Sequence, residues 1–328
     1  MDKITGAGLL VDSLKRQRVD YIFGVVGYPV IPIAFAAQQA GITYIGMRNE
    51  QAASYATQAA GYLTGRPQAC LVVPGPGVIH ALAGLANAKA NCWPMILLGG
   101  ASPTYLNGMG AFQEERQLMA ASQFCKFSQA VDALERIPLL VAQAVKTSLY
   151  GRPGPVYLDL PDNIITREID ASEVRQAETV PDPPSQEAPA QTIEAALDAL
   201  ESAERPLVIV GKGMAWSRAE AEVRKFIEQT RLPFLASPMG KGVVPDDHPL
   251  SVGGGRTHAL KEADVVFLMG ARFNWIMHFG LPPRFAGNLR VVQLDISADE
   301  IGTNVPAEVA LVGDGKSIVA QLNRALET

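Results

Sequence analysis

Short apolar runs with the composition of β-strands alternate with stretches of helical periodicity along nearly the whole sequence. In the first half, the apolar runs lie at 21–26, 42–47, 69–74, 94–99 and 155–160. The helical stretches between them lie at 4–18, 29–39, 50–64, 77–91 and 136–149. Several runs, such as ACLVVP, are apolar at every position, which is typical of strands buried on both faces of a parallel sheet. We therefore expect an α/β fold in which helices cover both faces of a doubly wound parallel sheet.

A second series of the same kind follows a change in composition. Around residues 166–190, the segment TVPDPPSQEAPAQ is rich in Pro and polar residues and is typical of a linker. The apolar runs then resume at 206–213, 232–237, 263–270, 290–297 and 309–314. We predict two α/β domains, 1–165 and 191–328, joined by the linker 166–190.

Charge and composition argue against several classes of partner. The formal net charge of -5 disfavours a surface for nucleic acid or for an anionic membrane. The longest apolar runs, such as MILLGGA, are too short to span a bilayer. We therefore expect no nucleic-acid partner and no membrane partner.

Three features of the sequence bear on its location. The first residues, MDKITGAGLLVDSL, include acids and no long apolar core, so we do not expect a signal peptide. The last three residues, Leu-Glu-Thr, are not a peroxisomal address. Each cysteine (Cys70, Cys92 and Cys125) lies in or beside an apolar run, where a buried thiol in a reducing compartment is expected. We predict a cytoplasmic protein.

Three loops are predicted to meet at the carboxyl edge of the first sheet, where ligands bind in open α/β folds. One carries Glu50, which follows a predicted strand and opens a predicted helix. An acid in a first turn is also favoured by the helix dipole, and that explanation stays open for Glu50 taken alone. The other two loops, FGVVGYP (23–29) and VVPGPG (72–77), contain glycines that permit close approach to a ligand. Together the loops indicate a ligand site.

The order of several motifs carries a family resemblance. The segments FGVVGYP, RNEQAA, VVPGPGVIHALAGLANAKANCWPMILLGG, GAFQE and GRPGPVYLDLPDN resemble the pyrimidine-binding domain of thiamine-diphosphate enzymes. The segments ERPLVIVGKGMAW, LPFLASPMGKGVVPDDHP, GARFNW and VQLDISADEIGTN resemble the central domain of the same enzymes. Within that superfamily, the sequence is most similar to the 2-hydroxyacyl-CoA lyases, with oxalyl-CoA decarboxylase as a close relative. The resemblance runs through nearly all 328 residues.

The resemblance implies a thiamine-diphosphate-dependent lyase that cleaves a 2-hydroxyacyl-CoA into formyl-CoA and an aldehyde or ketone. Asn49 and the pair Phe112-Gln113 favour the lyases over the decarboxylases. Tyr28 and Pro32 depart from the usual pattern of the first loop, which leaves the shape of the acyl pocket open. Two alternatives stay open, an oxalyl-CoA decarboxylase-like enzyme and a non-catalytic subunit that binds ADP or CoA.

The resemblance also assigns residues to the cofactor. Glu50 matches the carboxylate that hydrogen-bonds the aminopyrimidine ring and so promotes loss of the thiazolium C2 proton. Gln113 matches a residue presented to the reacting carbon, although an ordinary polar loop residue would look the same. His80 is expected to be packed rather than catalytic. The residues predicted to bind the cofactor are Gly27, Tyr28, Pro29, Asn49, Glu50, Pro74, Gly75, Gly77 and Asn87.

The second half offers a candidate nucleotide site. Lys212, Arg272 and Asp295 end predicted strands, and Arg152 in GRPG is a further phosphate candidate. In the oxalyl-CoA decarboxylases a similar set accepts ADP, and nearby surface meets CoA. Ordinary salt bridges at strand ends are the alternative for each residue. The segment GKGMAW is not a complete G-x-G-x-x-G motif, so it does not indicate a dinucleotide fold.

We expect no metal site in these residues. Asp314 in Gly-Asp-Gly resembles the start of the family's Mg²⁺ motif, but the chain is too short to complete it, so Asp314 is predicted to be a turn or helix cap. The resemblance places Mg²⁺ and the diphosphate on a C-terminal domain that we expect to be absent here. The cofactor would then lie between two copies in a homodimer or homotetramer, or would need a separate diphosphate-binding chain. A truncated or proteolysed fragment, a natural two-chain enzyme and a non-catalytic relic all stay open, and the isolated chain is expected to be inactive.

Overall fold

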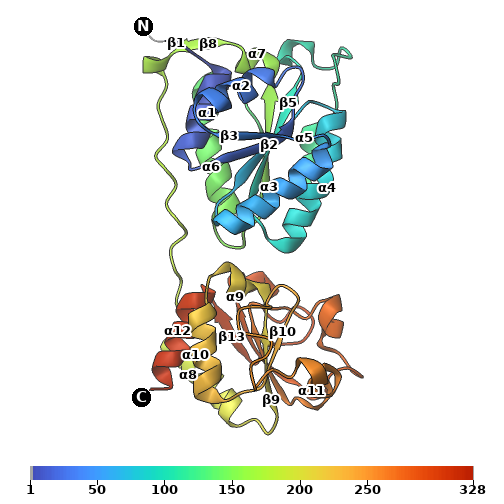
Figure 1. Cartoon of the computed structure of the whole chain (residues 1–328), viewed down its shortest axis with the longest axis vertical. Coiled ribbons are helices and arrows are strands. Elements are labelled where there is room, and N and C mark those ends of the chain that lie inside the picture. Colours follow the sequence, from blue (N-terminus) through green and yellow to red (C-terminus); the bar gives the residue numbers. More distant parts are fainter. Residues whose placement is uncertain (1–2, 328) are drawn as a thin grey trace. The chain divides into compact units, whose positions relative to one another are not determined.

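The structure of the protein is a computed structural model, in which residues 3–327 are described. The described residues form two compact units, which divide between Pro183 and Pro184. Figure 1 labels the helices and strands of both units.

The first unit is built on a six-stranded parallel sheet with the strand order β3-β2-β4-β5-β7-β6. Its strands are β2 (Tyr21–Val25), β3 (Thr43–Gly46), β4 (Gln68–Val72), β5 (Met95–Ala101), β6 (Phe127–Ala130) and β7 (Pro155–Pro161). Its helices are α1 (Gly6–Arg16), α2 (Ile31–Gln39), α3 (Glu50–Thr64), α4 (Pro76–Asn91), α5 (Gln117–Ser122), α6 (Ile137–Leu149) and α7 (Asp162–Ile165). The prediction of a doubly wound parallel α/β fold is confirmed.

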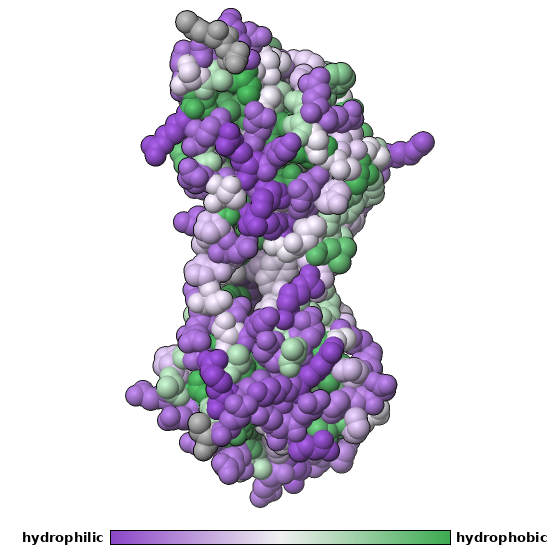
Figure 2. Space-filling model, turned by 60° about the vertical axis from the view of Figure 1, so that its left-hand side comes forward, coloured by the Kyte–Doolittle hydropathy of each residue, from purple (hydrophilic) through white to green (hydrophobic). Residues whose placement is uncertain are grey.

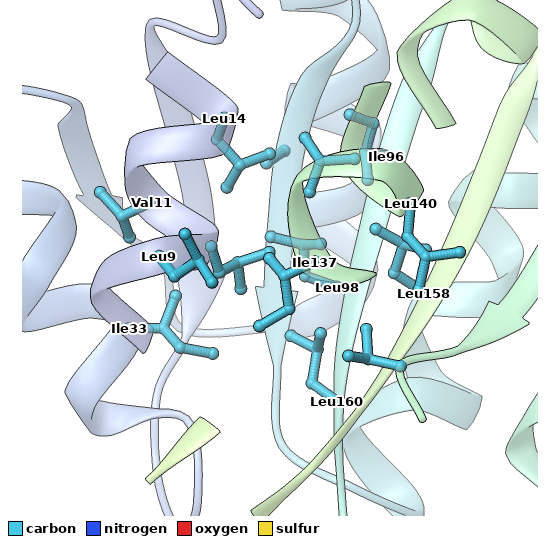
Figure 3. Close-up of a cluster of buried hydrophobic side chains, with 14 of the residues drawn as sticks. Leu9, Val11, Leu14, Ile33, Ile96, Leu98, Ile137, Leu140, Leu158 and Leu160 are labelled. Carbon is cyan, nitrogen blue, oxygen red and sulfur yellow. The ribbon is translucent and has the colours of Figure 1, made fainter. Parts of the chain in front are cut away.

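Helices cover both faces of this sheet because its central strands are apolar on both sides. Leu9 and Leu14 from α1, Ile33 from α2 and Leu140 from α6 pack with strand residues such as Leu98 on one face (Figure 3). On the other face, apolar residues of α3, α4 and α5 pack against Cys70, Val72 and Leu97. Strand β4 is buried at every position, which agrees with the apolar residues 69–72 that follow its first residue, Gln68.

Local sequence sets the ends of the helix that carries Glu50. Asn49 caps α3, since its side chain accepts a hydrogen bond from the backbone N–H of Ala52 at 2.9 Å. Gly65 ends the helix in the left-handed region, with φ of 72°. The observed helix, Glu50–Thr64, coincides with the predicted one.

Part of the predicted linker is folded onto the first unit. Strand β8 (Glu168–Asp170) pairs with β1 (Lys3–Thr5) in an antiparallel two-stranded sheet. Further on, Gln17 donates to the carbonyl of Glu178 and accepts from the backbone N–H of Val180, both at 2.8 Å. The segment therefore has fixed contacts that its composition did not predict.

The second unit has a five-stranded parallel sheet with the order β10-β9-β11-β12-β13. Its strands are β9 (Pro206–Val210), β10 (Phe234–Ala236), β11 (Val265–Met269), β12 (Arg290–Asp295) and β13 (Val309–Val312). Its helices are α8 (Ala190–Glu201), α9 (Lys212–Trp216), α10 (Glu220–Thr230), α11 (Arg256–Glu262) and α12 (Gly315–Ala325). Apolar residues of α8, α10 and α12 cover one face, and Leu260 of α11 packs with Phe273 and Phe285 on the other.

The distribution of apolar residues follows from these two cores. On the face shown in Figure 2, hydrophilic residues dominate and hydrophobic residues gather in small groups.

Cys70 is buried as expected, but Cys92 and Cys125 are only partly buried, and none of the three forms a disulfide. Within residues 3–327, no helix combines the length and the apolar character that crossing a membrane requires.

Candidate functional site

The strand order of the first unit places its topological switch point between β2 and β4. The chain leaves β2 toward β3 on one side and returns to β4 on the other, and the helices that follow β2 and β4 cover opposite faces of the sheet. Gly27, Tyr28 and Pro29 follow β2, and Pro74, Gly75 and Gly77 follow β4. The two predicted loops therefore flank the topological switch point, which is the ordinary ligand position in such sheets.

The two loops meet over the end of β5. A Cβ atom added to Gly100 would lie 3.0 Å from Cδ of Pro29 and 3.2 Å from Cδ of Pro74. Gly100 thus allows both prolines to approach the strand, and a larger residue would push the loops away.

The predicted catalytic loop packs against the same structure. A Cβ atom added to Gly75 would lie 2.5 Å from the carbonyl oxygen of Gln113. The ring of Phe112 meets the ring of Tyr28 edge-on, with centroids 5.8 Å apart, and the Tyr28 hydroxyl donates to Asp162 at 2.9 Å. The segments predicted around residues 28, 75 and 113 are therefore brought together.

Gln113 has two features that are uncommon in an ordinary loop residue. Its backbone has φ of 52°, in the left-handed region that non-glycine residues rarely adopt. Its side-chain oxygen Oε1 is buried, and it has no hydrogen-bond partner among the described residues. Strain and an unsatisfied buried polar atom in one residue indicate a functional position.

Glu50 is hydrogen-bonded to His80, a contact that the sequence did not predict. Nδ1 of His80, on α4, lies 2.8 Å from Oε2 of Glu50. The Glu50 side chain is 18% exposed and that of His80 is 49% exposed. The expectation that His80 is packed was therefore wrong. His80 lies one turn into the helix that follows the Pro74–Gly77 loop, at the sheet edge that carries Glu50. That position could have indicated its contact with Glu50.

Beneath this pair lies a thiol that stays neutral. Burial raises the pKa of Cys70 to about 12, and the negative charge of Glu50 acts in the same direction. Cys70 therefore contributes no charge to the site near neutral pH.

Two asparagines of the predicted set have different positions. Asn49 lies beside Glu50 as the cap of α3. Asn87 is exposed near the other end of α4, about 16 Å along the helix axis from its first residue, and accepts a hydrogen bond from Asn91. The structure thus separates Asn87 from the other predicted cofactor residues.

A buried polar network supports the loops and was not predicted. The amide of Gln117 donates to the carbonyl of Gly100 and to Oδ1 of Asp159, each at 2.6 Å, and accepts from the backbone N–H of Gly75 at 2.7 Å. The Tyr157 hydroxyl also donates to Oδ1 of Asp159, at 2.5 Å. Burial raises the pKa of Asp159 despite these donors.

A cavity of about 420 Å³ lies beside this network. Its lining includes Pro74, Ser102, Gln113, Arg116, Gln117 and Asp159. The volume falls within the range of small-molecule sites, and Gln113 contributes to the wall.

Three predicted nucleotide residues lie at one edge of the second sheet. Lys212 begins α9 after β9, Arg272 follows β11, and Asp295 ends β12, and these three strands are neighbours. Arg272 forms an ion pair with Glu300 at 3.2 Å. Oδ1 of Asp295 accepts from the backbone N–H of Ser297 at 2.9 Å. Arg272 therefore forms the kind of salt bridge at a strand end that was the alternative to a nucleotide contact.

The fourth predicted nucleotide residue, Arg152, belongs to the other unit. It lies in the first unit, in the loop that precedes β7, where its carbonyl accepts a hydrogen bond from Lys126 at 2.7 Å. The amino end of β7 faces away from the edge that carries Glu50, since all strands of the sheet are parallel.

Asp314 is a helix cap, as predicted. Its side chain accepts from the backbone N–H of Ser317 at 2.8 Å, at the start of α12. Across residues 3–327, no group of three or more His, Cys, Asp and Glu side chains is arranged to hold a metal ion.

Comparison with known families agrees with both units. Residues 4–121 match the thiamine pyrophosphate enzyme N-terminal TPP binding domain, and residues 193–322 match the central domain of the same enzymes. The chain therefore belongs to the thiamine pyrophosphate enzymes, of which it carries the N-terminal and central domains.

Among proteins of this family, the chain is similar to 2-hydroxyacyl-CoA lyases and to an oxalyl-CoA decarboxylase. The chain is 51% identical to 2-hydroxyacyl-CoA lyase 1 of Mus musculus over 321 residues, which are 98% of this chain and 55% of the relative. It is 48% identical to 2-hydroxyacyl-CoA lyase 1 of Homo sapiens, over 99% of this chain and 56% of the relative. It is 41% identical to oxalyl-CoA decarboxylase of Escherichia coli, over 94% of this chain and 55% of the relative. The chain thus spans about half the length of these curated relatives.

The residues present fit the pyrimidine half of the cofactor. A flat heteroaromatic ring needs loops that approach closely, which the glycines at 75 and 100 permit, and a carboxyl group for its ring nitrogen. Glu50 supplies that carboxyl group, and the strained loop of Gln113 supplies an unsatisfied amide oxygen.

Proposed function

We propose that this chain forms the pyrimidine-binding and central part of a thiamine-diphosphate-dependent lyase that cleaves 2-hydroxyacyl-CoA into formyl-CoA and an aldehyde or ketone. The observation that carries the proposal is the Glu50 carboxyl group, held by His80 at the edge where the Gly27–Pro29 and Pro74–Gly77 loops converge. The similarity to 2-hydroxyacyl-CoA lyases over 98% of this chain supports the choice of substrate class.

The roles of the residues follow from their chemistry. When bound, thiamine diphosphate supplies a nucleophilic carbon and an electron sink for cleavage of the C–C bond. Glu50 exchanges a proton with the pyrimidine ring nitrogen, because a carboxyl group within hydrogen-bond reach can act as general acid and base. Gly27, Tyr28, Pro29, Asn49, Pro74, Gly75 and Gly77 form the surrounding wall. Gln113 accepts a hydrogen bond from the substrate hydroxyl group through Oε1, which has no partner among the described residues.

The remaining parts of the proposal concern groups beyond this site. We propose that Mg²⁺ and the diphosphate are bound by a further domain, on the same protein or on a separate chain, within a homodimer or homotetramer. Lys212, Arg272 and Asp295 favour ADP or CoA at the second sheet, because they gather at the carboxyl ends of adjacent strands. Cysteines without disulfides support a cytoplasmic location.

The test is co-production of this chain with the part of the Mus musculus relative that it does not match. Formyl-CoA release from a 2-hydroxyacyl-CoA is then followed by chromatography. We expect wild type to release formyl-CoA and Glu50→Gln to be slower by about 10²–10⁴-fold. Glu194→Gln, at an exposed position of α8, is the matched control and should keep the wild-type rate.

Other outcomes separate the alternatives. Full activity in Glu50→Gln would reject the role of Glu50. Formyl-CoA from oxalyl-CoA but none from 2-hydroxyacyl-CoA would favour the decarboxylase. Calorimetric titration of the chain with ADP and with CoA tests the second unit, and the absence of binding heat from both would remove that part of the proposal.

A further inference from the structure

The pair of Glu50 and His80 is held by two helices that pack closely. Glu50 is the first residue of α3, and His80 lies on α4. A Cβ atom added to Gly84 of α4 would lie 2.4 Å from Cβ of Ser54 of α3, so the helices meet at a glycine. Ser54 lies one helical turn after Glu50, and Gly84 lies one turn after His80. Close packing at these two residues therefore fixes the distance between the Glu50 and His80 side chains.

The hydrogen bond from His80 engages one of the two oxygens of the Glu50 carboxyl group. His80 contacts Oε2 at 2.8 Å, and in the described chain His80 is the side chain that engages this carboxyl. An ionised carboxylate only accepts, so His80 must carry its proton on Nδ1 when it bonds this form. Oε1 is then the oxygen available to another group.

Burial is unequal between the partners. Glu50 is 18% exposed and His80 is 49% exposed. An exposed ion pair contributes little to stability, so this contact is a weak device for holding the fold together. A glutamate side chain has several rotamers, however, and one hydrogen bond from a fixed helix selects among them.

We propose that His80 is a positioning residue for Glu50, whose Nδ1–H bond holds the carboxyl group in one orientation and leaves Oε1 for the pyrimidine nitrogen. This inference rests on the proposed function. The hydrogen bond itself, rather than the charge of an imidazolium, carries the effect. An asparagine at position 80 places an amide N–H close to the position of Nδ1, so it should retain the orientation.

The first readout needs no cofactor. In ¹H–¹⁵N spectra of the chain labelled on histidine, the Nδ1–H proton of His80 should appear as a protected, downfield signal. His80→Ala identifies the signal, and Glu50→Ala should abolish its protection against exchange with water. A His80 Nδ1–H that exchanges equally fast in wild type and Glu50→Ala would overturn the inference.

The second readout is deuterium exchange at the C2 proton of bound thiamine diphosphate, in the chain co-produced with the diphosphate-binding part. A hydrogen bond to a charged group corresponds to about 10–100-fold in rate, so we expect His80→Ala to slow exchange by that factor. His80→Asn should stay within about threefold of wild type. His258→Ala, at an exposed helical histidine of the second unit, is the matched control and should exchange at the wild-type rate.

The outcomes distinguish this inference from the proposed function. Wild-type exchange in His80→Ala, or equal loss in His80→Ala and His80→Asn, would overturn the positioning role. If Glu50→Gln keeps the wild-type exchange rate, the proposed function fails first. Loss in Glu50→Gln together with wild-type exchange in His80→Ala would remove this inference alone.

Discussion

Gln117 is bound to Gly75 by a hydrogen bond of 2.7 Å, from the backbone N–H of the glycine to Oε1 of the buried amide. The Nε2 group of the same amide donates to the carbonyl of Gly100 and to Asp159. One side chain therefore satisfies polar groups from the ends of β4, β5 and β7, and it fixes the Pro74–Gly77 loop where the candidate site requires it.

The substitution Gln117→Leu should destabilise the first unit. It removes the side-chain partner of the Gly75 N–H and of the Gly100 carbonyl, and it removes a donor from Asp159. We expect the free energy of unfolding, measured with urea, to fall by about 2–4 kcal/mol. Gln123→Leu, at an exposed position after α5, is the control and should change it by less than about 0.5 kcal/mol. Equal effects of the two substitutions would contradict the role of the network.

The substitution Gly75→Ala should cost more than an ordinary left-handed glycine. Gly75 has φ of 55° and ψ of -109°, and its Cβ would lie 2.5 Å from the carbonyl oxygen of Gln113. Gly65 also has positive φ, 72°, but its Cβ would meet nothing within 4 Å. Thermal or urea unfolding should show a loss of about 1 kcal/mol for Gly65→Ala, from backbone strain alone, and a larger loss for Gly75→Ala. A loss at Gly75 no larger than that at Gly65 would show that the Gln113 loop moves aside freely.

The sequence predicted those parts of the fold that leave a local signal. The helix at 50–64 coincides with α3 because Asn49 caps it and Gly65 ends it. The run at 155–160 coincides closely with β7, Pro155–Pro161, because apart from Asp159 it is apolar and buried. The three predicted site loops also meet, because parallel strands bring their carboxyl ends to one edge.

Other parts left no such signal. Strand β6, Phe127–Ala130, is a half-buried edge strand without an apolar run, and it was missed. The pairing of β1 with β8 joins segments more than 160 residues apart, and no local pattern predicts such a contact. The contact of His80 with Glu50 depends on how α3 packs against α4, which helix periodicity alone does not determine.

Asp159 should make the stability of the first unit depend on pH. Burial raises its pKa above the usual value, so the folded state binds a proton more tightly than the unfolded state does. Its contribution to stability is therefore present at low pH and is lost as the pH rises from about 4 through the raised pKa. We expect the free energy of unfolding of wild type, relative to Asp159→Asn, to fall across that range in urea titrations.

Asp170 provides a control of opposite sign for the pH experiment. The hydroxyl and backbone N–H of Ser172 hold the pKa of Asp170 below its usual value. Its contribution is present above the ordinary carboxyl pKa and is lost as the pH falls. Wild type relative to Asp170→Asn should therefore gain stability as the pH rises. The same direction of change for both aspartates would contradict the assignment at Asp159.

Arg66 should be the residue that fastens the segment after β8 to the first unit. Its side chain is 9% exposed and donates to Asp182 at 2.6 Å and to the carbonyls of Val180 and Gln17. Arg66→Met leaves both carbonyls buried without this donor, so we expect a loss of about 2–4 kcal/mol in the free energy of unfolding. Faster cleavage by a protease that cuts after glutamate is also expected, because Glu178 lies in the released segment.

Arg18→Met is a matched control for Arg66→Met, since Arg18 binds the same carboxylate, that of Asp182, at 2.8 Å but is 48% exposed. The loss in free energy of unfolding in Arg18→Met should stay within about 0.5 kcal/mol. Unchanged cleavage in Arg66→Met would show that the contacts of Gln17 with residues 178 and 180 hold the segment by themselves.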